Sequence, residues 1–133
     1  MIAASFSIFN QLRGQTSFVT SPDSIQIAYE VHGAGDPALI FVHGWSCDRS
    51  YWKGQLETFS KNFKVVAIDL AGHGESGLGR QAWTIEAFGA DVEAVVEKLG
   101  LKRVILIGHS MRGDVIGRGR APITRSCYWP GYG

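Results

Sequence analysis

Three short apolar runs, each separated from the next by a segment of helical periodicity, constrain the fold of this 133-residue chain more than any other feature. The runs lie at residues 38–42, 64–69 and 103–107. The first is apolar throughout, which is typical of a strand buried on both faces of a sheet. Strands that alternate with helices along a chain form a sheet with parallel central strands. The sequence therefore predicts an α/β fold.

The segment after the first run has the spacing of an amphipathic helix. Apolar side chains recur at intervals of four, three and four residues, and they are Trp52, Leu56, Phe59 and Phe63. Ser50 precedes them and is the expected N-cap, because a serine side chain can accept a hydrogen bond from the first free amides of a helix. We expect Trp52 to lie in the core rather than in a binding site.

The segment after the second run has the same kind of periodicity. Its apolar face consists of Ile85, Phe88, Val92, Val95 and Leu99. Thr84 is the expected N-cap of this helix. Gly100 followed by Leu101 fits a Schellman ending, in which a glycine in the left-handed conformation terminates the helix.

Two alternating segments precede the first apolar run. Residues 17–20 and 25–31 alternate apolar and polar side chains, and Ser21-Pro22-Asp23-Ser24 lies between them with the composition of a turn. An antiparallel N-terminal hairpin followed by a parallel βαβαβ arrangement is therefore expected. We expect the domain to occupy residues 16–116 and residues 1–15 to form a disordered leader.

A serine follows the third apolar run in a context typical of a nucleophile. Gly108-His109-Ser110-Met111 comes directly after the run, so that a buried strand turns into a helix at Ser110. This strand–turn–helix arrangement, a nucleophile elbow, exposes the serine hydroxyl. The elbow prefers glycine two residues after the serine, where this chain has Arg112, so we expect a strained turn. The alternative is an ordinary strand-to-helix junction in which Ser110 is the N-cap.

Two further motifs follow the other two apolar runs. His43-Gly44-Trp45 comes after the first run, and a segment from Asp69 to Ser76 begins at the end of the second. Acyl transfer through a serine requires backbone N–H groups aimed at the oxygen of the tetrahedral intermediate. We assign these two donors to the backbone amides of Trp45 and Met111. The alternative for His43-Gly44 is a turn that merely tolerates glycine.

These three motifs, in this order, resemble those of the α/β-hydrolase fold superfamily, and most of all those of its esterase, lactonase and C–C hydrolase-like branch. The resemblance extends from Thr16 to Ile116. It implies a serine nucleophile at Ser110 and an oxyanion hole formed by the Trp45 and Met111 amides. It also implies that the strands before the first and third motifs are neighbours in the sheet. The implied substrate is a small molecule with an ester-like bond, cleaved through an acyl-enzyme.

The other members of the catalytic triad are not apparent. In the α/β-hydrolase fold the acid and the histidine follow the serine along the chain. Residues 111–133 contain one acid, Asp114, and no histidine. We do not expect any of the four earlier histidines to act as the base, and we expect Asp69 to orient its loop rather than to catalyse. The expected triad acid and histidine lie outside this chain, and the chain in this truncated form is expected to be inactive.

The last segment of the chain does not continue the pattern. Residues 117–133 are rich in glycine, arginine and proline and show neither helical nor strand periodicity, although a long helix is expected after Ile116. A frameshift or truncation after Ile116 is one explanation, and a native disordered tail is the other. In either case the sheet is expected to end at the strand 103–107 with an unpaired edge.

Composition excludes several other classes of function. A net charge of +1 at pH 7 gives no reason to expect nucleic acid or an anionic membrane as a partner. The two cysteines do not have the spacing of a zinc site or a disulfide framework. Gly72 to Gly77 matches a dinucleotide fingerprint but lies between later strands, so no cofactor or metal is expected.

The sequence identifies no protein partner. A cytoplasmic location is favoured over secretion because the N-terminus lacks a typical signal peptide.

Two functions are thus compatible with the sequence. The first is the N-terminal part of a serine hydrolase, in which Ser110 attacks an ester-like carbonyl. The second is a non-catalytic α/β fragment or pseudoenzyme with at most a binding role. Labelling of Ser110 by a fluorophosphonate probe distinguishes the two, since only an activated serine reacts.

Overall fold

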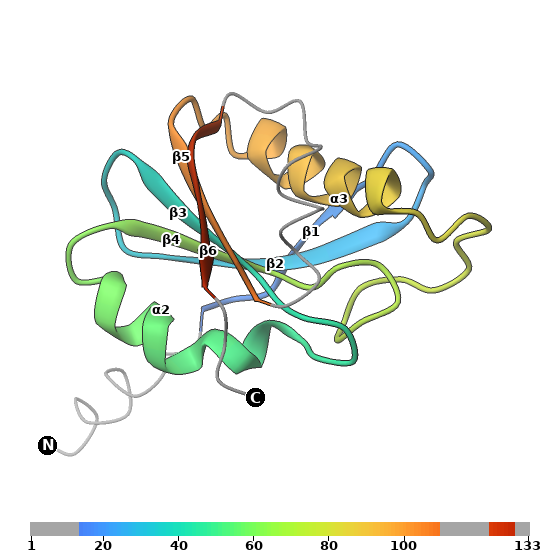
Figure 1. Ribbon diagram of the computed structural model, residues 1–133, viewed down its shortest axis with the longest axis horizontal. Coiled ribbons are helices and arrows are strands. Elements are labelled where there is room, and N and C mark those ends of the chain that lie inside the picture. The colour runs from blue at the N-terminus through green and yellow to red at the C-terminus, as the bar shows by residue number, and fades with distance from the viewer. Residues whose placement is uncertain (1–13, 110–122, 130–133) are drawn as a thin grey trace, which may run out of the picture.

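The computed structural model describes residues 14–109 and, as backbone only, residues 123–129. These residues form one mixed sheet with helices on both of its faces (Figure 1). The strands are β1 (Ser17–Thr20), β2 (Gln26–His32), β3 (Ala38–Val42), β4 (Lys64–Ile68), β5 (Val104–His109) and β6 (Ile123–Trp129). The helices are the 3₁₀ helix η1 (Arg49–Trp52), α2 (Lys53–Phe59) and α3 (Ile85–Lys98).

The order of the strands confirms the predicted α/β topology. The sheet has six strands in the order β1-β2-β4-β3-β5-β6. β1 and β2 form the expected antiparallel hairpin, and β2 is also antiparallel to β4. β3 pairs in parallel with β4 on one side and with β5 on the other, and all five of its residues are buried. A strand in this central position is apolar throughout because both of its faces are covered.

The connections from β3 to β4 and from β4 to β5 place helices on opposite faces of the sheet. β4 lies on one side of β3 and β5 on the other, so right-handed crossovers carry α2 and α3 to different faces. Figure 1 shows α3 on one side of the sheet and α2 on the other. Alternate residues of β3 separate the two cores: Ile40 packs with the α3 cluster, whereas Leu39 and Phe41 pack with Trp52 and Leu56. Trp52 is a core residue, as predicted.

Both ends of α3 are formed as the sequence predicts. The Thr84 hydroxyl accepts a hydrogen bond from the Ala87 amide at 3.1 Å, which makes Thr84 the N-cap. At the other end, the Leu101 amide donates to the Val96 carbonyl at 3.1 Å and the Gly100 amide to the Glu97 carbonyl at 3.0 Å. This pair of bonds defines a Schellman motif. Gly100 has a φ of 62°, the left-handed conformation that the motif requires.

The predicted start and length of the other helix are wrong. Asp48, not Ser50, is the N-cap of η1, because its carboxylate accepts a hydrogen bond from the Ser50 amide at 2.8 Å. Helix α2 ends at Phe59, and Phe63 packs against the same core from the loop that follows. Phe59 itself is 40% exposed and meets the core at the Phe41 ring, with 6.2 Å between the ring centroids, so the spacing from Phe59 to Phe63 does not mark one buried helical face. Hydrogen bonds from the Ser50 side chain and, to a smaller extent, from the Ser50 amide lower the pKa of the Asp48 carboxyl.

β6 overturns a second expectation, namely that the strand 103–107 ends the sheet. β6 pairs in parallel with β5, from Val104 opposite Ile123 to His109 opposite Trp129. The backbone groups at the edge of β5 are a template for a further strand, and the residue types of β6 include several that favour strands. The expected leader (1–15) and tail (117–133) lie mostly outside the described residues, so the domain bounds 16–116 remain a prediction.

Candidate active site

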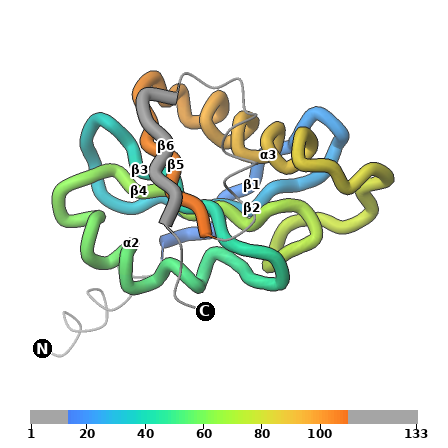
Figure 2. Tube along the Cα trace, in the orientation of Figure 1, coloured from blue at the N-terminus to red at the C-terminus, as the bar shows by residue number. Residues whose placement is uncertain are grey.

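Three sequence motifs meet at one edge of the sheet because they follow three adjacent parallel strands. β4 follows β3 in the sequence and lies on one side of it, whereas the next strand, β5, lies on its other side. The strand order therefore reverses at β3. In open α/β sheets, ligands bind outside the carboxyl ends of the strands at such a reversal point. Figure 2 shows the loops that follow β3 and β4 on the same side of the molecule. This edge is the candidate active site.

The neighbouring positions of β3 and β5 confirm what the resemblance implies about the two strands. Val42, the last residue of β3, lies opposite Gly108 of β5. The loop that begins at His43 therefore starts beside the strand end that leads to Ser110. Ser110, Met111 and Arg112 lie outside the described residues, so their roles as nucleophile, oxyanion donor and source of strain remain predictions.

His43 is a structural residue that joins the loops after β3 and β4. Its side chain is completely buried, and its Nε2 accepts a hydrogen bond from the Leu70 amide at 3.0 Å. Because Nε2 accepts, the ring proton resides on Nδ1, which lies 2.8 Å from the Gly44 carbonyl oxygen and donates to it. With both ring nitrogens committed in this way, His43 cannot accept a proton from a serine.

Trp45 lies in a tight turn, residues 44–47, hereafter the Trp45 turn. The Cys47 amide donates to the Gly44 carbonyl at 3.2 Å, and Ser46 has a φ of 59° at the third position of the turn. A positive φ at this position is typical of a type II turn. The bond that closes the turn uses the Cys47 amide and not the Trp45 amide. The Trp45 ring is 56% exposed and meets His73 edge-on, with 5.4 Å between the ring centroids.

Asp69 orients the surrounding loops, in agreement with the expectation from the sequence. Its side chain is completely buried, and one carboxylate oxygen, Oδ1, accepts from the Arg49 amide at 2.7 Å. The other, Oδ2, accepts from the Glu75 amide at 3.0 Å and from the Arg49 guanidinium. A Cβ at Gly74, whose φ is 50°, would lie 2.3 Å from Asp69 Oδ2, so only glycine fits there. Ser76 ties the same loop to β2 by donating to the Asp69 carbonyl at 2.6 Å and accepting from the Ala28 amide at 2.8 Å.

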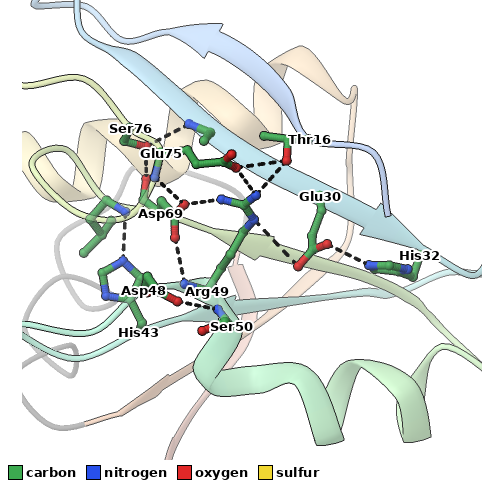
Figure 3. A network of polar contacts seen from close by, with 12 residues as sticks. Thr16, Glu30, His32, His43, Asp48, Arg49, Ser50, Asp69, Glu75 and Ser76 are labelled. Atoms are coloured by element: carbon green, nitrogen blue, oxygen red, sulfur yellow. Dashed lines mark hydrogen bonds and ion pairs between the residues drawn. The ribbon is translucent and has the colours of Figure 1, made fainter. Parts of the chain in front are cut away.

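Arg49 is a central residue of this edge that the sequence analysis missed. Its guanidinium contacts the carboxylates of Asp69, Glu75 and Glu30 and donates to the Thr16 hydroxyl at 2.7 Å (Figure 3). We call these five residues the Arg49 network. Burial opposes the charge of Arg49, but the hydrogen bond to Glu75 and the nearby carboxylates raise its pKa above the usual value. The same hydrogen bond lowers the pKa of Glu75.

The other histidines are also engaged in contacts. His32 lies on β2 with its Nε2 3.2 Å from a Glu30 carboxylate oxygen, and His73 Nδ1 lies 3.0 Å from the Ala71 carbonyl. His109 packs against Tyr51 with ring centroids 5.0 Å apart. Within the part of the chain that the structure describes, His109 Nδ1 and Trp52 Nε1 are buried without a hydrogen-bond partner.

A second arginine, also missed from the sequence, lies between the N-terminal hairpin and α3. The Arg80 side chain is 1% exposed, and its guanidinium contacts the carboxylates of Asp23 (2.6 Å) and Asp91 (2.5 Å). We call these three residues the Arg80 network. Asp91 also accepts from the Ala71 amide at 3.2 Å. Burial raises the pKa of Asp91 although Arg80 opposes the shift, whereas the hydrogen bond from Arg80 lowers the pKa of the exposed Asp23.

Neither a metal centre nor a membrane span is found in the described part of the chain. Across residues 14–109, no group of three or more histidine, cysteine, aspartate or glutamate side chains is arranged to hold a metal ion. Of the helices described, none is both long and apolar enough to cross a bilayer.

Two curated proteins illustrate what the chain is similar to. It is 36% identical over 102 residues to a non-heme haloperoxidase of Rhodococcus erythropolis, covering 76% of this chain and 37% of that protein. It is 38% identical over 101 residues to a bifunctional esterase/perhydrolase of Acinetobacter calcoaceticus, covering 74% of this chain and 37% of that protein. The chain thus spans little more than a third of the length of these relatives.

Solved structures and a family model agree with these similarities. A thermophilic esterase from Thermogutta terrifontis superposes with a TM-score of 0.76 at 30% identity, covering 86% of this chain and 44% of that one. The family model described as alpha/beta hydrolase fold matches residues 37–113, which is more than half of the chain and includes all three motifs. The chain belongs to the alpha/beta hydrolase fold family.

Proposed function

We propose that this chain carries the N-terminal part of a serine hydrolase that cleaves ester-like bonds in small molecules through an acyl-enzyme. The observation that carries the proposal is the position of the Trp45 turn, which starts beside the strand end that leads to Ser110. The proposed roles are nucleophile for Ser110 and oxyanion donors for the backbone amides of Trp45 and Met111.

The proposed chemistry follows from these roles. The Ser110 hydroxyl oxygen bonds to the carbonyl carbon of the ester, its proton passes to a base, and the carbonyl oxygen becomes an oxyanion. The two amides donate hydrogen bonds to that oxyanion, a contribution that is worth about 3–4 kcal/mol per donor in other serine hydrolases. Collapse of the intermediate expels the alcohol, which takes up the proton and leaves the acyl group on Ser110. Attack by water on this acyl group then releases the acid and regenerates the serine.

We propose that none of the four histidines of the described chain supplies the base for this chemistry, His73 included, whose Nδ1 lies 3.0 Å from the Ala71 carbonyl. His43 has both ring nitrogens in hydrogen bonds, and His32 pairs with Glu30 on β2, away from the candidate site. His109 precedes the nucleophile directly and packs against Tyr51. We therefore propose that the 133-residue polypeptide by itself does not turn over esters, because it lacks a base and has arginine at position 112, where the elbow prefers glycine.

The names of the similar proteins support esters as the class of substrate. One of the relatives is named an esterase/perhydrolase, and the superposed structure is that of an esterase. We extend this only to small-molecule carboxylic esters as a class.

Replacement of the nucleophile by a thiol tests the proposal without requiring the base. A free thiol has a pKa of about 8.5 and is partly ionised near neutral pH, so Ser110→Cys needs no histidine to react. We expect an activated phenyl ester to acylate position 110 at least about tenfold faster in the folded chain than in the same variant unfolded in urea, because only the folded chain offers oxyanion donors. Mass spectrometry of peptides separates this site from Cys47 and Cys127.

Two controls complete the test. Ser110→Ala gives the background of acylation at other sites. The parent chain is expected not to react with a fluorophosphonate probe, and labelling that disappears in Ser110→Ala would contradict the proposed inactivity. Equal acylation rates at position 110 in the folded and unfolded chain would contradict the proposed site and favour the alternative of a non-catalytic fragment with at most a binding role.

A further inference from the structure

The loop that contains the proposed oxyanion donor Trp45 is fixed at both ends to the two residues that follow β4. At its start, His43 Nε2 accepts from the Leu70 amide at 3.0 Å. At its end, the Arg49 amide donates to Asp69 Oδ1 at 2.7 Å. Residues 43–49 are therefore held by two consecutive residues, 69 and 70.

The attachment at Arg49 is made twice by the same carboxylate. The Arg49 amide donates to one oxygen of Asp69, and the Arg49 guanidinium contacts the other (Figure 3). A charged hydrogen bond to a fully buried carboxylate is stronger than one between neutral groups. Removal of the guanidinium would leave the buried Asp69 carboxylate with one amide donor on each oxygen and without its ionic partner, which would weaken the attachment of the loop.

The rest of the guanidinium is held by segments on the other side of the loop. Its Nη2 donates to the Thr16 hydroxyl and to Glu75, and its Nε lies 3.7 Å from a Glu30 carboxylate oxygen. These partners come from the strand β2, from the segment before β1 and from the loop after β4. The Arg49 side chain is 13% exposed and that of Glu30 is 16% exposed, so the contact between them is shielded from solvent, whereas the Glu75 side chain is 58% exposed.

We propose that Arg49 is a positioning residue for the oxyanion hole. By holding Asp69 and being held by it, Arg49 fixes the far end of residues 43–49 and thereby the direction of the Trp45 amide. The proposal rests on the proposed role of the Trp45 amide. A lysine cannot replace the arginine fully, because a single ammonium group cannot reach Asp69, Glu75 and Thr16 together as a planar guanidinium does.

Hydrogen exchange of individual amides tests this inference without any catalytic activity. In Arg49→Met we expect exchange of the amides of residues 44–48 to accelerate about tenfold, while amides in β3, β4 and α3 keep their rates. Arg49→Lys should give an intermediate acceleration at the same amides. The matched control is Arg103→Met, which removes an exposed ion pair with Asp36 at the other end of β5 and should leave residues 44–48 unchanged.

A second experiment tests whether the position of the loop affects the rate of acylation at position 110. In the Ser110→Cys background, Arg49→Met should lower the rate of acylation of position 110 by about tenfold at saturating ester, and Arg49→Lys should recover part of it. If the Ser110→Cys chain is not acylated preferentially when folded, the proposed function fails, but the exchange experiment still decides whether Arg49 holds the loop.

The inference is overturned by either of two results. Unchanged exchange at residues 44–48 in Arg49→Met would show that the other attachments suffice. An equal acceleration across β3, β4 and α3 would show that Arg49 stabilises the whole fold rather than the loop. Should Arg49→Met fail to fold, Arg49→Lys decides the question by the same two criteria, since it keeps the positive charge beside Asp69.

Discussion

Arg49 and Arg80 each compensate the charge of a buried aspartate, but they do so in two regions of the molecule and with different consequences. Each is an arginine that contacts one completely buried aspartate and at least one further carboxylate. The Arg80 network joins the turn of the β1–β2 hairpin to α3, and the guanidinium lies 5.5 Å from the centroid of the Phe88 ring. The Arg49 network instead joins loops at the carboxyl edge of the sheet.

The two networks differ in the parts of the structure that they connect. Asp91 belongs to a long helix packed on the sheet, so the Arg80 network contributes to the packing of that layer. Asp69 belongs to the loop after β4 and accepts hydrogen bonds from the Glu75 amide of the same loop and from the Arg49 amide at the start of η1. The same chemistry therefore supports the fold in one region and the geometry of the candidate site in the other. Three substitutions test this distinction, in order of decreasing effect.

The largest effect is expected for Arg80→Met. It leaves the Asp91 carboxylate buried without its ionic partner, a change that costs about 3–5 kcal/mol in other buried pairs. We expect urea unfolding to show this loss as a lower midpoint. Replacing both partners, as in Arg80→Met with Asp91→Leu, should recover much of it, because the unpaired charge is then absent. A loss below about 1 kcal/mol for Arg80→Met would show that the pair lies in a better solvated region than its burial indicates.

An intermediate effect is expected for Gly74→Ala. The new Cβ would lie 2.3 Å from Asp69 Oδ2, so the buried carboxylate must move and the Arg49 network must open. Gly100→Ala is the matched control, because Gly100 also has a positive φ but has open space around the Cβ position. The control should cost about 1–2 kcal/mol from backbone strain alone, and Gly74→Ala should cost more. Equal losses in thermal unfolding would mean that Asp69 relaxes without cost.

The smallest effect is expected from the titration of Glu75, an exposed member of the Arg49 network. The hydrogen bond from Arg49 lowers its pKa below the usual 4.5. A lowered pKa in the folded state means that Glu75 stabilises the fold above pH 4.5 and that this contribution is lost as the pH falls through the folded pKa. Glu75→Gln should therefore be less stable than the parent at pH 7, and the difference in unfolding free energy should vanish on acidification. A pH-independent difference would contradict this account.

Much of the fold follows from local patterns in the sequence. The uniformly apolar residues 38–42 and the Gly100 ending of α3 each reflect a local property of the backbone or of side-chain spacing. Local rules failed where two of them competed. Asp48 and Ser50 are both good N-cap residues, and only the three-dimensional entry of the chain into η1 decides in favour of Asp48.

The candidate site was predictable in its motifs but not in its supporting contacts. The glycines and the polar residues after each apolar run indicate the edge at which the loops meet. Arg49 and Arg80, in contrast, bind carboxylates that lie 20 and 57 residues away along the chain. Nothing in the local sequence distinguishes an arginine with such partners from one on the surface, because the pairing depends on which loops the sheet brings together.

The span of the Arg49 network also has a consequence for the order of events during folding. The hydrogen bond from Thr16 to Glu75 joins residues that are 59 positions apart, so forming it closes a long loop. Such a contact becomes favourable only after β2, β3 and β4 have aligned. We therefore expect substitutions in this network to change the unfolding rate far more than the folding rate. The residues that fix the Trp45 turn would then govern how long a folded molecule persists, not how quickly it forms.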